Sequence, residues 1–189
     1  VLSNRTALLK YPSLKSQTKF FLPLGSLLTV VEFNESWAKI LFKNHNKISY
    51  GYLPSKDVVK INHKICDWVY IAEKLIGTPY RWGGRNTLGI DCSALVQLSL
   101  QTAGIKFPRD TNIQQNAKYK EISNLNEIRR GMLIFWEGHV AVSINKDNIV
   151  HANAYHMQTK IEPLVNAIKR IKENSGGITK ILNLSMVNK

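Results

Sequence analysis

Cys92 has the surroundings that nucleophilic chemistry requires of a cysteine. It follows a glycine-rich segment, residues 77–89, and lies in the stretch Asp91–Val96, which has the pattern of a first helical turn. Main-chain N–H groups without partners and the positive end of the helix dipole favour a thiolate there, and the thiolate is the reactive form of cysteine. These features alone leave a second interpretation open, which is a small buried core cysteine.

Two histidines are candidate proton acceptors for this thiol. His139 and His151 are each expected at the start of a β-strand, and the two strands are consecutive in the chain. If these strands pair antiparallel in a suitable register, the rings meet. His139 would then take the proton of Cys92, and His151 would hold the far nitrogen of His139 in the correct tautomer. Because a lone strand histidine is usually structural, the prediction rests on the three residues together.

A zinc centre is a competing interpretation of these three side chains. One thiolate and two imidazoles form an acceptable zinc ligand set with an open position. The sequence indicates no fourth ligand, which favours catalysis without a metal. We therefore expect no cofactor.

Short β segments occupy the first third of the chain. They are expected at residues 6–10, 26–33, 37–42 and 48–53, separated by prolines, a glycine and an Asn-Glu-Ser turn. Segments of this length and spacing are typical of a small β-barrel. The stretch from Tyr50 to Val59 resembles the end of a bacterial SH3-like domain.

Helical spacing replaces the β pattern at Asn62, which is a plausible cap for a helix that ends at Gly77. We therefore expect a domain boundary between residues 61 and 62. The second domain, residues 62–189, has mixed patterns and is predicted to be α+β. Beyond the first helix, helices are expected at residues 92–103, after Pro108 and at 162–172, and strands at residues 132–136, 139–144, 149–152 and 178–184.

Four short motifs stand in a fixed order along this second domain. They are Gly77-Thr78-Pro79-Tyr80-Arg81-Trp82-Gly83-Gly84, Asp91-Cys92-Ser93, Gly138-His139-Val140 and His151-Ala152-Asn153-Ala154. Their order and spacing resemble the NlpC-type cell-wall cysteine peptidases, and the similarity covers residues 63–184. The resemblance implies a papain-like α+β catalytic domain with a central antiparallel sheet. An SH3-like domain before it is the usual companion in members that cleave γ-D-glutamyl bonds.

By position, the resemblance assigns Cys92 as nucleophile, His139 as base and His151 as the polar residue that orients the base. It also implies that Asp91 binds the ammonium group of a free N-terminal L-Ala, although a helix cap is an alternative role for this carboxylate. Tyr80 and Trp82 have the alternative role of core aromatics. The remaining positions implied to contact substrate are Ser93, Tyr80, Trp82, Thr111 and, from the SH3-like domain, Tyr50 or Tyr52.

The resemblance therefore predicts a cysteine endopeptidase. Its substrate would be the bond between γ-D-glutamate and an L-diamino acid, diaminopimelate or lysine, in peptidoglycan stem peptides with a free N-terminal L-Ala. Two other functions stay open at this point. One is an acyltransferase that uses the same three residues, and the other is a non-catalytic cell-wall-binding module.

The composition narrows the partners and the location. The 189 residues include 44% hydrophobic residues, enough for a packed core, and no apolar run reaches the roughly 20 residues that span a bilayer. The formal charge of +13 is spread along the chain, so nucleic acid is not an expected partner. Two cysteines, Cys66 and Cys92, are too few for a disulfide scaffold. We expect a cytoplasmic monomer, or a periplasmic or secreted protein if a signal preceded Val1.

Overall fold

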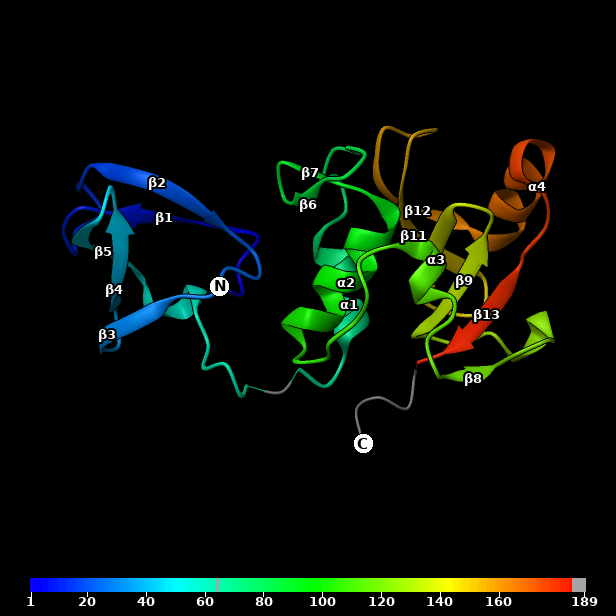
Figure 1. The fold of residues 1–189 in the computed structure, drawn as a ribbon, viewed down its shortest axis with the longest axis horizontal. Helices are drawn as coiled ribbons and strands as arrows, with labels where there is room; N and C mark the ends of the chain where they lie inside the picture. Colours follow the sequence, from blue (N-terminus) through cyan, green and yellow to red (C-terminus); the bar gives the residue numbers. More distant parts are fainter. Residues whose placement is uncertain (64, 185–189) are drawn as a thin grey trace. The chain divides into compact units, whose positions relative to one another are not determined.

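The computed structural model describes residues 1–63 and 65–184 and has an α+β fold (Figure 1). The chain divides into two compact units, residues 1–63 and 64–189. This division falls where the sequence pattern changes from short β segments to helical spacing. Among the described residues, every helix is too short or too polar to cross a membrane.

The first unit is a five-stranded antiparallel sheet in the order β2-β1-β5-β4-β3. Its small core is formed by Leu8, Ala38, Ile40, Leu53 and Val58. The four predicted β segments are confirmed, whereas β2 was not predicted because its side chains are mostly exposed and do not alternate. The strands are β1 (Arg5–Leu9), β2 (Thr18–Pro23), β3 (Thr29–Phe33), β4 (Trp37–Asn44) and β5 (Lys47–Pro54), followed by the 3₁₀ helix η1 (Ser55–Asp57).

The second unit is built around a six-stranded antiparallel sheet in the order β12-β11-β10-β9-β13-β8. Its strands are β8 (Lys120–Glu121), β9 (Met132–Trp136), β10 (His139–Ser143), β11 (Asn148–Asn153), β12 (Gln158–Pro163) and β13 (Lys180–Asn183). The glycine-rich segment contributes a separate short hairpin, β6 (Arg85–Asn86) and β7 (Gly89–Ile90). The helices are α1 (Trp68–Lys74), α2 (Cys92–Thr102), α3 (Thr111–Gln114), the 3₁₀ helix η2 (Leu125–Glu127) and α4 (Leu164–Ser175).

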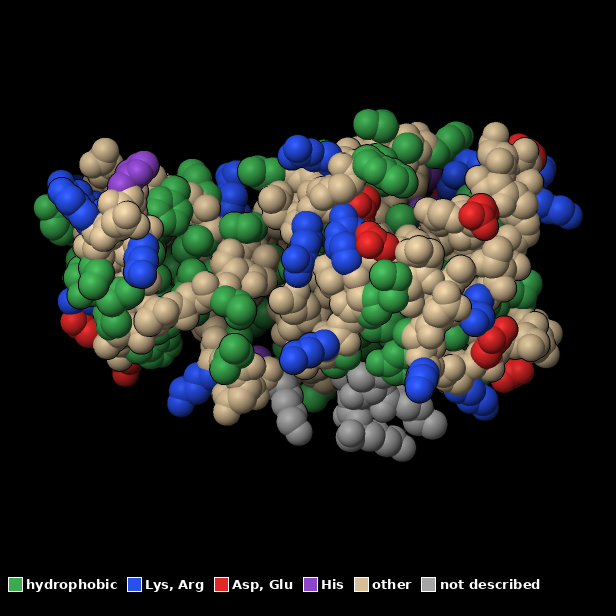
Figure 2. Space-filling model, in the orientation of Figure 1, with side chains coloured by type: hydrophobic (Ala, Val, Ile, Leu, Met, Phe, Trp, Pro, Cys, Tyr) green, Lys and Arg blue, Asp and Glu red, His purple; other side chains and the backbone are tan. Residues whose placement is uncertain are grey.

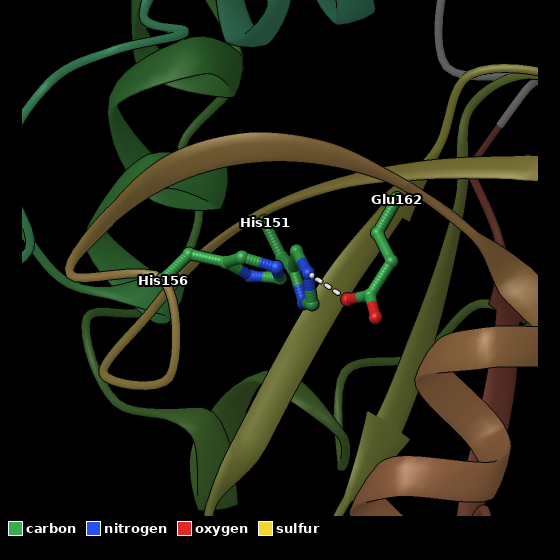
Figure 3. A group of neighbouring side chains, drawn as sticks. All are labelled: His151, His156 and Glu162. Carbon is green, nitrogen blue, oxygen red and sulfur yellow. Dashed lines mark hydrogen bonds and ion pairs between the residues drawn. The ribbon is translucent and has the colours of Figure 1, made fainter.

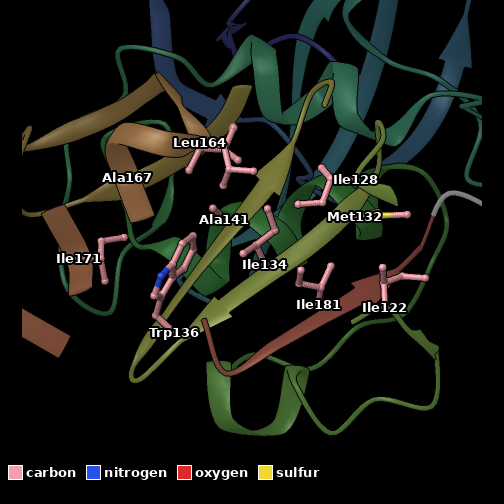
Figure 4. Close-up of a cluster of buried hydrophobic side chains, with 11 residues drawn as sticks. Ile122, Ile128, Met132, Ile134, Trp136, Ala141, Leu164, Ala167, Ile171 and Ile181 are labelled. Atoms are coloured by element: carbon pink, nitrogen blue, oxygen red, sulfur yellow. The ribbon is translucent and has the colours of Figure 1, made fainter. Parts of the chain in front are cut away.

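The central strands are buried on both faces. Alternate side chains of β9 and β10, such as Ile134, Trp136 and Ala141, point to one face, where α4 packs on them. Helix α2 also contacts β10 and β11, so these strands are nearly continuous apolar runs without polar alternation. Figure 4 shows the cluster on the α4 side, which comprises Ile122, Ile128, Met132, Ile134, Trp136, Ala141, Ile149, Leu164, Ala167, Ile171 and Ile181.

Helix α1 begins later than the sequence pattern predicts. Its cap is Asp67, whose side chain accepts a hydrogen bond from the main-chain N–H of Val69, and not Asn62. The guanidinium of Arg130 donates to both Asp67 and Glu73, at 2.7–2.9 Å, and so fixes both ends of this short helix. The ion pairs come from a residue far along the chain, which helical periodicity does not reveal.

The predicted helix at residues 162–172 is wrong at its start. Glu162 belongs to β12, where it pairs with Ile149 of β11, and α4 begins only after Pro163. Strand β12 was not predicted, because it lies at one edge of the sheet and its buried and exposed side chains do not alternate. This correction matters for the site, since it places Glu162 on the sheet that carries both histidines.

Lys and Arg side chains are dispersed over both units on the face shown in Figure 2, with acidic side chains between them. On this face the distribution agrees with a solvated basic surface.

Candidate active site

Cys92 is the first residue of α2, as the sequence predicts. The side chain of Asp91 accepts a hydrogen bond from the main-chain N–H of Ala94 at 2.8 Å, which is the usual N-cap arrangement. The cysteine is 6% exposed. Its sulfur therefore sits at the start of a capped helix, almost out of solvent.

The thiol of Cys92 lies against the main chain of β10. Its neighbours are the N–H groups of Val140 and Ser93 and the hydroxyl of Thr111, whose Oγ1 is 3.9 Å from Sγ. These donors favour a thiolate, but burial outweighs them and raises the pKa of Cys92. The resting form is therefore the thiol, and not the thiolate that a helix start alone would favour.

His139 and His151 meet on one face of the sheet. Strands β10 and β11 pair antiparallel with Val142 opposite Val150. Ala141 and Ile149 both belong to the cluster on the α4 side, and His139 and His151 lie two residues from them on the same strands, so alternation puts both rings on that face. Nε2 of His139 lies 3.0 Å from Nδ1 of His151, as the sequence analysis required of the two rings. His151 is fully buried in the middle of β11, however, rather than at its start.

A carboxylate and a guanidinium extend this pair of rings. Oε2 of Glu162 lies 3.0 Å from Nε2 of His151 (Figure 3), and Arg170 of α4 donates to both oxygens of Glu162, at 2.6 and 3.2 Å. Burial alone would raise the pKa of Glu162, but the hydrogen bonds from His151 and Arg170 outweigh it and lower that pKa to about 2. Glu162 is therefore ionised, and as a carboxylate it only accepts hydrogen bonds.

The ionised Glu162 determines the proton positions in both rings. Because it can only accept, Nε2 of His151 carries a proton, and where this is the only proton of the ring, Nδ1 is an acceptor. Nε2 of His139 must then donate to that Nδ1. The remaining lone pair of His139 is on Nδ1, the ring nitrogen nearer the main chain. The sulfur of Cys92 is close to this part of β10, because its hydrogen-bond partner is the main-chain N–H of Val140, the residue after His139.

His139 is neutral in the folded protein. Burial first, and then the neighbouring His151 and Arg170, lower the pKa of His139 to about 3. The site thus holds a protonated thiol at the main chain of β10, beside the residue that follows an unprotonated base. Such a pair can transfer a proton from sulfur to nitrogen while sulfur attacks an electrophile.

Asp91 is held by groups of the protein. Oδ1 accepts from the N–H of Ala94 and from Nη1 of Arg109 at 3.0 Å, and Oδ2 accepts from the N–H of Gly83 at 2.9 Å and from Nη2 of Arg109 at 2.5 Å. Asp91 is 7% exposed, and Arg109 neutralises its charge. This environment favours the helix-cap alternative over the binding of a substrate ammonium group.

A cavity of about 280 Å³ opens beside Cys92, and Trp82, Ser93 and Thr111 line it as the substrate prediction requires. Trp82 is 82% exposed, which argues against its alternative role as a core aromatic. The hydroxyl of Ser93 is engaged within the protein, because it donates to Asp91 and accepts from Arg109.

Tyr80 and Tyr50, both predicted to contact substrate, lie in different surroundings. Burial raises the pKa of Tyr80, with smaller contributions from Cys92 and Asp91, which places its hydroxyl near these two residues. Tyr50 lies on β5 of the first unit and is 45% exposed. Its contact with substrate stays a prediction, as does that of Tyr52.

Sequence reasoning missed Arg109, Asp110, Glu162 and Arg170. A signal existed for the first two, because Pro108-Arg109-Asp110-Thr111 directly precedes a predicted cleft residue and a buried Asp91 needs a cation. No comparable signal existed for Glu162, which the periodicity assigned to a helix.

Comparisons with known proteins agree with this fold. The NlpC/P60 family model matches residues 77–172. Dipeptidyl-peptidase 6 of Lysinibacillus sphaericus is 40% identical over 85 residues, which cover 45% of this chain and 31% of that protein. Peptidoglycan endopeptidase RipA of Mycobacterium tuberculosis is 31% identical over 109 residues, which cover 49% of this chain and 23% of that protein. This chain thus covers less than a third of either relative.

A crystal structure of an NlpC/P60 family protein from Bacillus cereus has the same fold. It superposes with a TM-score of 0.72 over 94% of this chain and 61% of that chain, at 23% sequence identity. The agreement extends through both units, and the family match alone covers just over half of the residues. The chain therefore belongs to the NlpC/P60 family.

Proposed function

We propose that this chain is a cysteine peptidase acting on peptidoglycan stem peptides, and that it hydrolyses the bond between γ-D-glutamate and an L-diamino acid. One observation carries the proposal. The thiol of Cys92, at the start of α2, lies beside the strand that carries the neutral His139. Buried hydrogen bonds from His139 to His151 and from His151 to Glu162 determine which ring nitrogen of His139 is free to accept a proton. The family match and the name of the mycobacterial relative support peptidoglycan as the substrate class.

In the proposed reaction, the sulfur of Cys92 attacks the γ-glutamyl carbonyl while Nδ1 of His139 takes the thiol proton. The C–N bond breaks as His139 returns this proton to the leaving amine. Water then attacks the thioester and gives a proton to the same nitrogen, the C–S bond breaks, and His139 returns the proton to the sulfur of Cys92. The main-chain N–H of Cys92, at the start of the helix, supplies part of the oxyanion hole.

A free N-terminal L-Ala carries an ammonium group, which needs an anionic partner in the cavity. Asp91 already shares its charge with Arg109. Asp110 lines the same cavity, is exposed, and makes no side-chain cap hydrogen bond to α3. We therefore assign the ammonium contact to Asp110 in place of Asp91, because its exposed carboxylate interacts with Arg109 less strongly than Asp91 does and can pair at a modest desolvation cost.

Mass spectrometry of the products formed from L-Ala-γ-D-Glu-diaminopimelate tests the proposal. The expected products are the dipeptide L-Ala-D-Glu and free diaminopimelate. Cys92→Ala should form neither, whereas Cys66→Ala, which alters the exposed cysteine, should retain turnover. Substantial release of the diamino acid by Cys92→Ala, or cleavage at another bond, would contradict the assignment. The same assay with lysine in place of diaminopimelate defines the preferred diamino acid.

A further inference from the structure

Three potential metal ligands lie on the side of His151 that faces away from His139. The ligand atoms of His151, His156 and Glu162 all lie within 4.8 Å of one another (Figure 3). They come from β11, from the turn that follows it, and from β12. Two imidazoles and a carboxylate are a ligand set that zinc takes in proteins, with a fourth position left for water.

His156 is oriented as a metal ligand should be. Oδ1 of Asn153 accepts from the main-chain N–H of His156 at 2.8 Å and lies 3.1 Å from Nδ1 of its ring. Nδ1 therefore carries the proton, and Nε2 has a free lone pair. A hydrogen bond from the opposite ring nitrogen is the usual way in which proteins fix a metal-binding histidine.

The spacing and the access suit a small ion. Nε2 of His151 and Oε2 of Glu162 are 3.0 Å apart, and tetrahedral zinc at its usual bond lengths holds such atoms about 3.3 Å apart. For this pair a shift of a few tenths of an ångström makes room, whereas the ring of His156, whose ligand atom lies within 4.8 Å of the other two, must move closer by up to about 1.5 Å. His156 and Glu162 also line an open cavity of about 380 Å³, so an ion can reach these two ligands from solvent, while His151 is buried behind them.

Nearby cations determine which ion can bind. Arg170 donates to Glu162, and Lys160 lines the same cavity, so a bound ion must share the carboxylate with Arg170. Mg²⁺ and Ca²⁺ depend on oxygen ligands and would gain little here. Zinc gains from two neutral imidazole nitrogens, so it tolerates the weakened carboxylate better.

We propose that His151, His156 and Glu162 form a zinc site whose occupation switches off the peptidase. The inhibitory part rests on the proposed function. Zinc on Nε2 of His151 displaces the proton there, so the neutral ring carries its proton on Nδ1 and donates to Nε2 of His139. The proton of His139 then resides on Nδ1, which can no longer accept the proton of Cys92. One proton shifts within each ring, and their total number is unchanged.

Zinc binding is tested first on the Cys92→Ala variant, because this variant cannot hold zinc through the catalytic thiol. Titration against a chromophoric zinc chelator should show one zinc per chain. Adding His156→Ala should weaken binding at least roughly tenfold. The double variant Cys92→Ala with His63→Ala, which alters an exposed histidine, should bind as Cys92→Ala does. Equal binding by the His156→Ala and His63→Ala double variants would overturn the site, whether or not the chain proves to be a peptidase.

Inhibition is tested with the chain that retains Cys92. His156 makes no contact with Cys92 or His139 in the reaction proposed above, so His156→Ala and His156→Gln should keep the activity measured with a chelator present. Zinc should inhibit the unaltered chain and His63→Ala, and it should not inhibit either His156 variant. Inhibition of equal strength in all four proteins would mean that zinc acts at the thiol, and would overturn the switch.

Nuclear magnetic resonance of ¹⁵N in the imidazole rings tests the proposed mechanism directly. In Cys92→Ala without metal, Nε2 of His139 should carry the proton, and with zinc the signal should move to that of the Nδ1–H form. A His139 ring that keeps its tautomer on zinc binding would overturn the coupling between the two sites.

Discussion

At the scale of single residues, burial keeps both reacting groups neutral in the free protein. It raises the pKa of the Cys92 thiol and lowers that of the His139 imidazole to about 3, because it disfavours the charged form of each. A preformed thiolate and imidazolium are thus not the resting state. The proton moves from sulfur to Nδ1 of His139 during the attack. The reaction therefore requires the tautomer of His139 in which Nδ1 carries no proton.

Glu162→Gln should lower kcat with little change in KM. The amide of Gln can donate to His151 as well as accept from it, so the tautomers of His151 and His139 are no longer determined by charge. We expect a loss on the order of 10- to 100-fold, the range typical of residues that orient a functional histidine. Steady-state kinetics measures this loss, and the ring ¹⁵N signals of His139 should show a mixture of tautomers.

Glu173→Gln, on the exposed part of α4, is the matched control for Glu162→Gln and should leave kcat unchanged. A Glu162→Gln enzyme with normal kcat, or with a loss confined to KM, would show that Glu162 does not act through the histidines.

Asp110→Asn should weaken the binding of peptides with a free amino terminus. The exposed carboxylate of Asp110 lines the cavity beside Cys92, so its loss removes the partner proposed for the ammonium group. We expect KM for L-Ala-γ-D-Glu-diaminopimelate to rise about fivefold, as for the loss of one exposed charge pair of roughly 1 kcal/mol. The N-acetylated peptide should be cleaved equally by both enzymes, and an equal effect on both peptides would refute the ammonium contact.

At the scale of elements, a tight hairpin positions the proposed base. Trp136 and His139 face each other across β9 and β10, so only Glu137 and Gly138 form the turn. Gly138 has a φ of 67°, in the left-handed region that favours glycine. Diagonal neighbours on β10, β11 and β12 then bring His139, His151 and Glu162 onto one face.

Gly138→Ala should destabilise the fold and lower turnover. Nothing lies within 4 Å of the position that a Cβ would take, so the expected cost comes from the backbone conformation alone. That cost is about 1 kcal/mol, and relaxing it moves His139. Urea unfolding measures the loss. Gly177→Ala is the control, because its Cβ also meets nothing within 4 Å and its φ is outside the left-handed region. Equal stability of the two variants would contradict the strain argument.

At the scale of the whole molecule, the two units have separate hydrophobic cores. The first unit is organised around residues such as Leu8 and Leu53, and the second around the cluster between the sheet and α4. The proposed nucleophile, base and orienting residues all belong to the second unit. Only the predicted tyrosine contact, Tyr50, comes from the first.

A fragment of residues 62–189 should therefore fold alone. Its own core and its full six-stranded sheet satisfy the requirements of an independent domain. We expect one cooperative thermal transition by circular dichroism, and its loss in the same fragment with Ile134→Asp, which buries a charge in the core. A fragment without a cooperative transition would contradict this expectation. KM of the fragment, compared with that of the full chain, then measures how much the first unit contributes to substrate binding. KM of Tyr50→Phe in the full chain measures the part of this contribution that is due to the Tyr50 hydroxyl.

The sequence by itself determined the features that depend on neighbouring residues. The start of α2 at Cys92, the strand at residues 132–136 and the presence of a strand beginning at His139 follow from local patterns, and the structure confirms them. The family also follows from short motifs in order. Local patterns succeed here because capping and side-chain alternation act over only a few residues.

Only the tertiary structure decided how the polar groups of the site are paired. Arg109 lies 18 residues from Asp91 and Glu162 lies 11 residues from His151, and in each case the partner is chosen by strand register or by a loop that folds back. The protonation of Cys92 likewise depends on burial by segments distant in the chain. These pairings are long-range consequences of packing, which no periodicity in the sequence encodes.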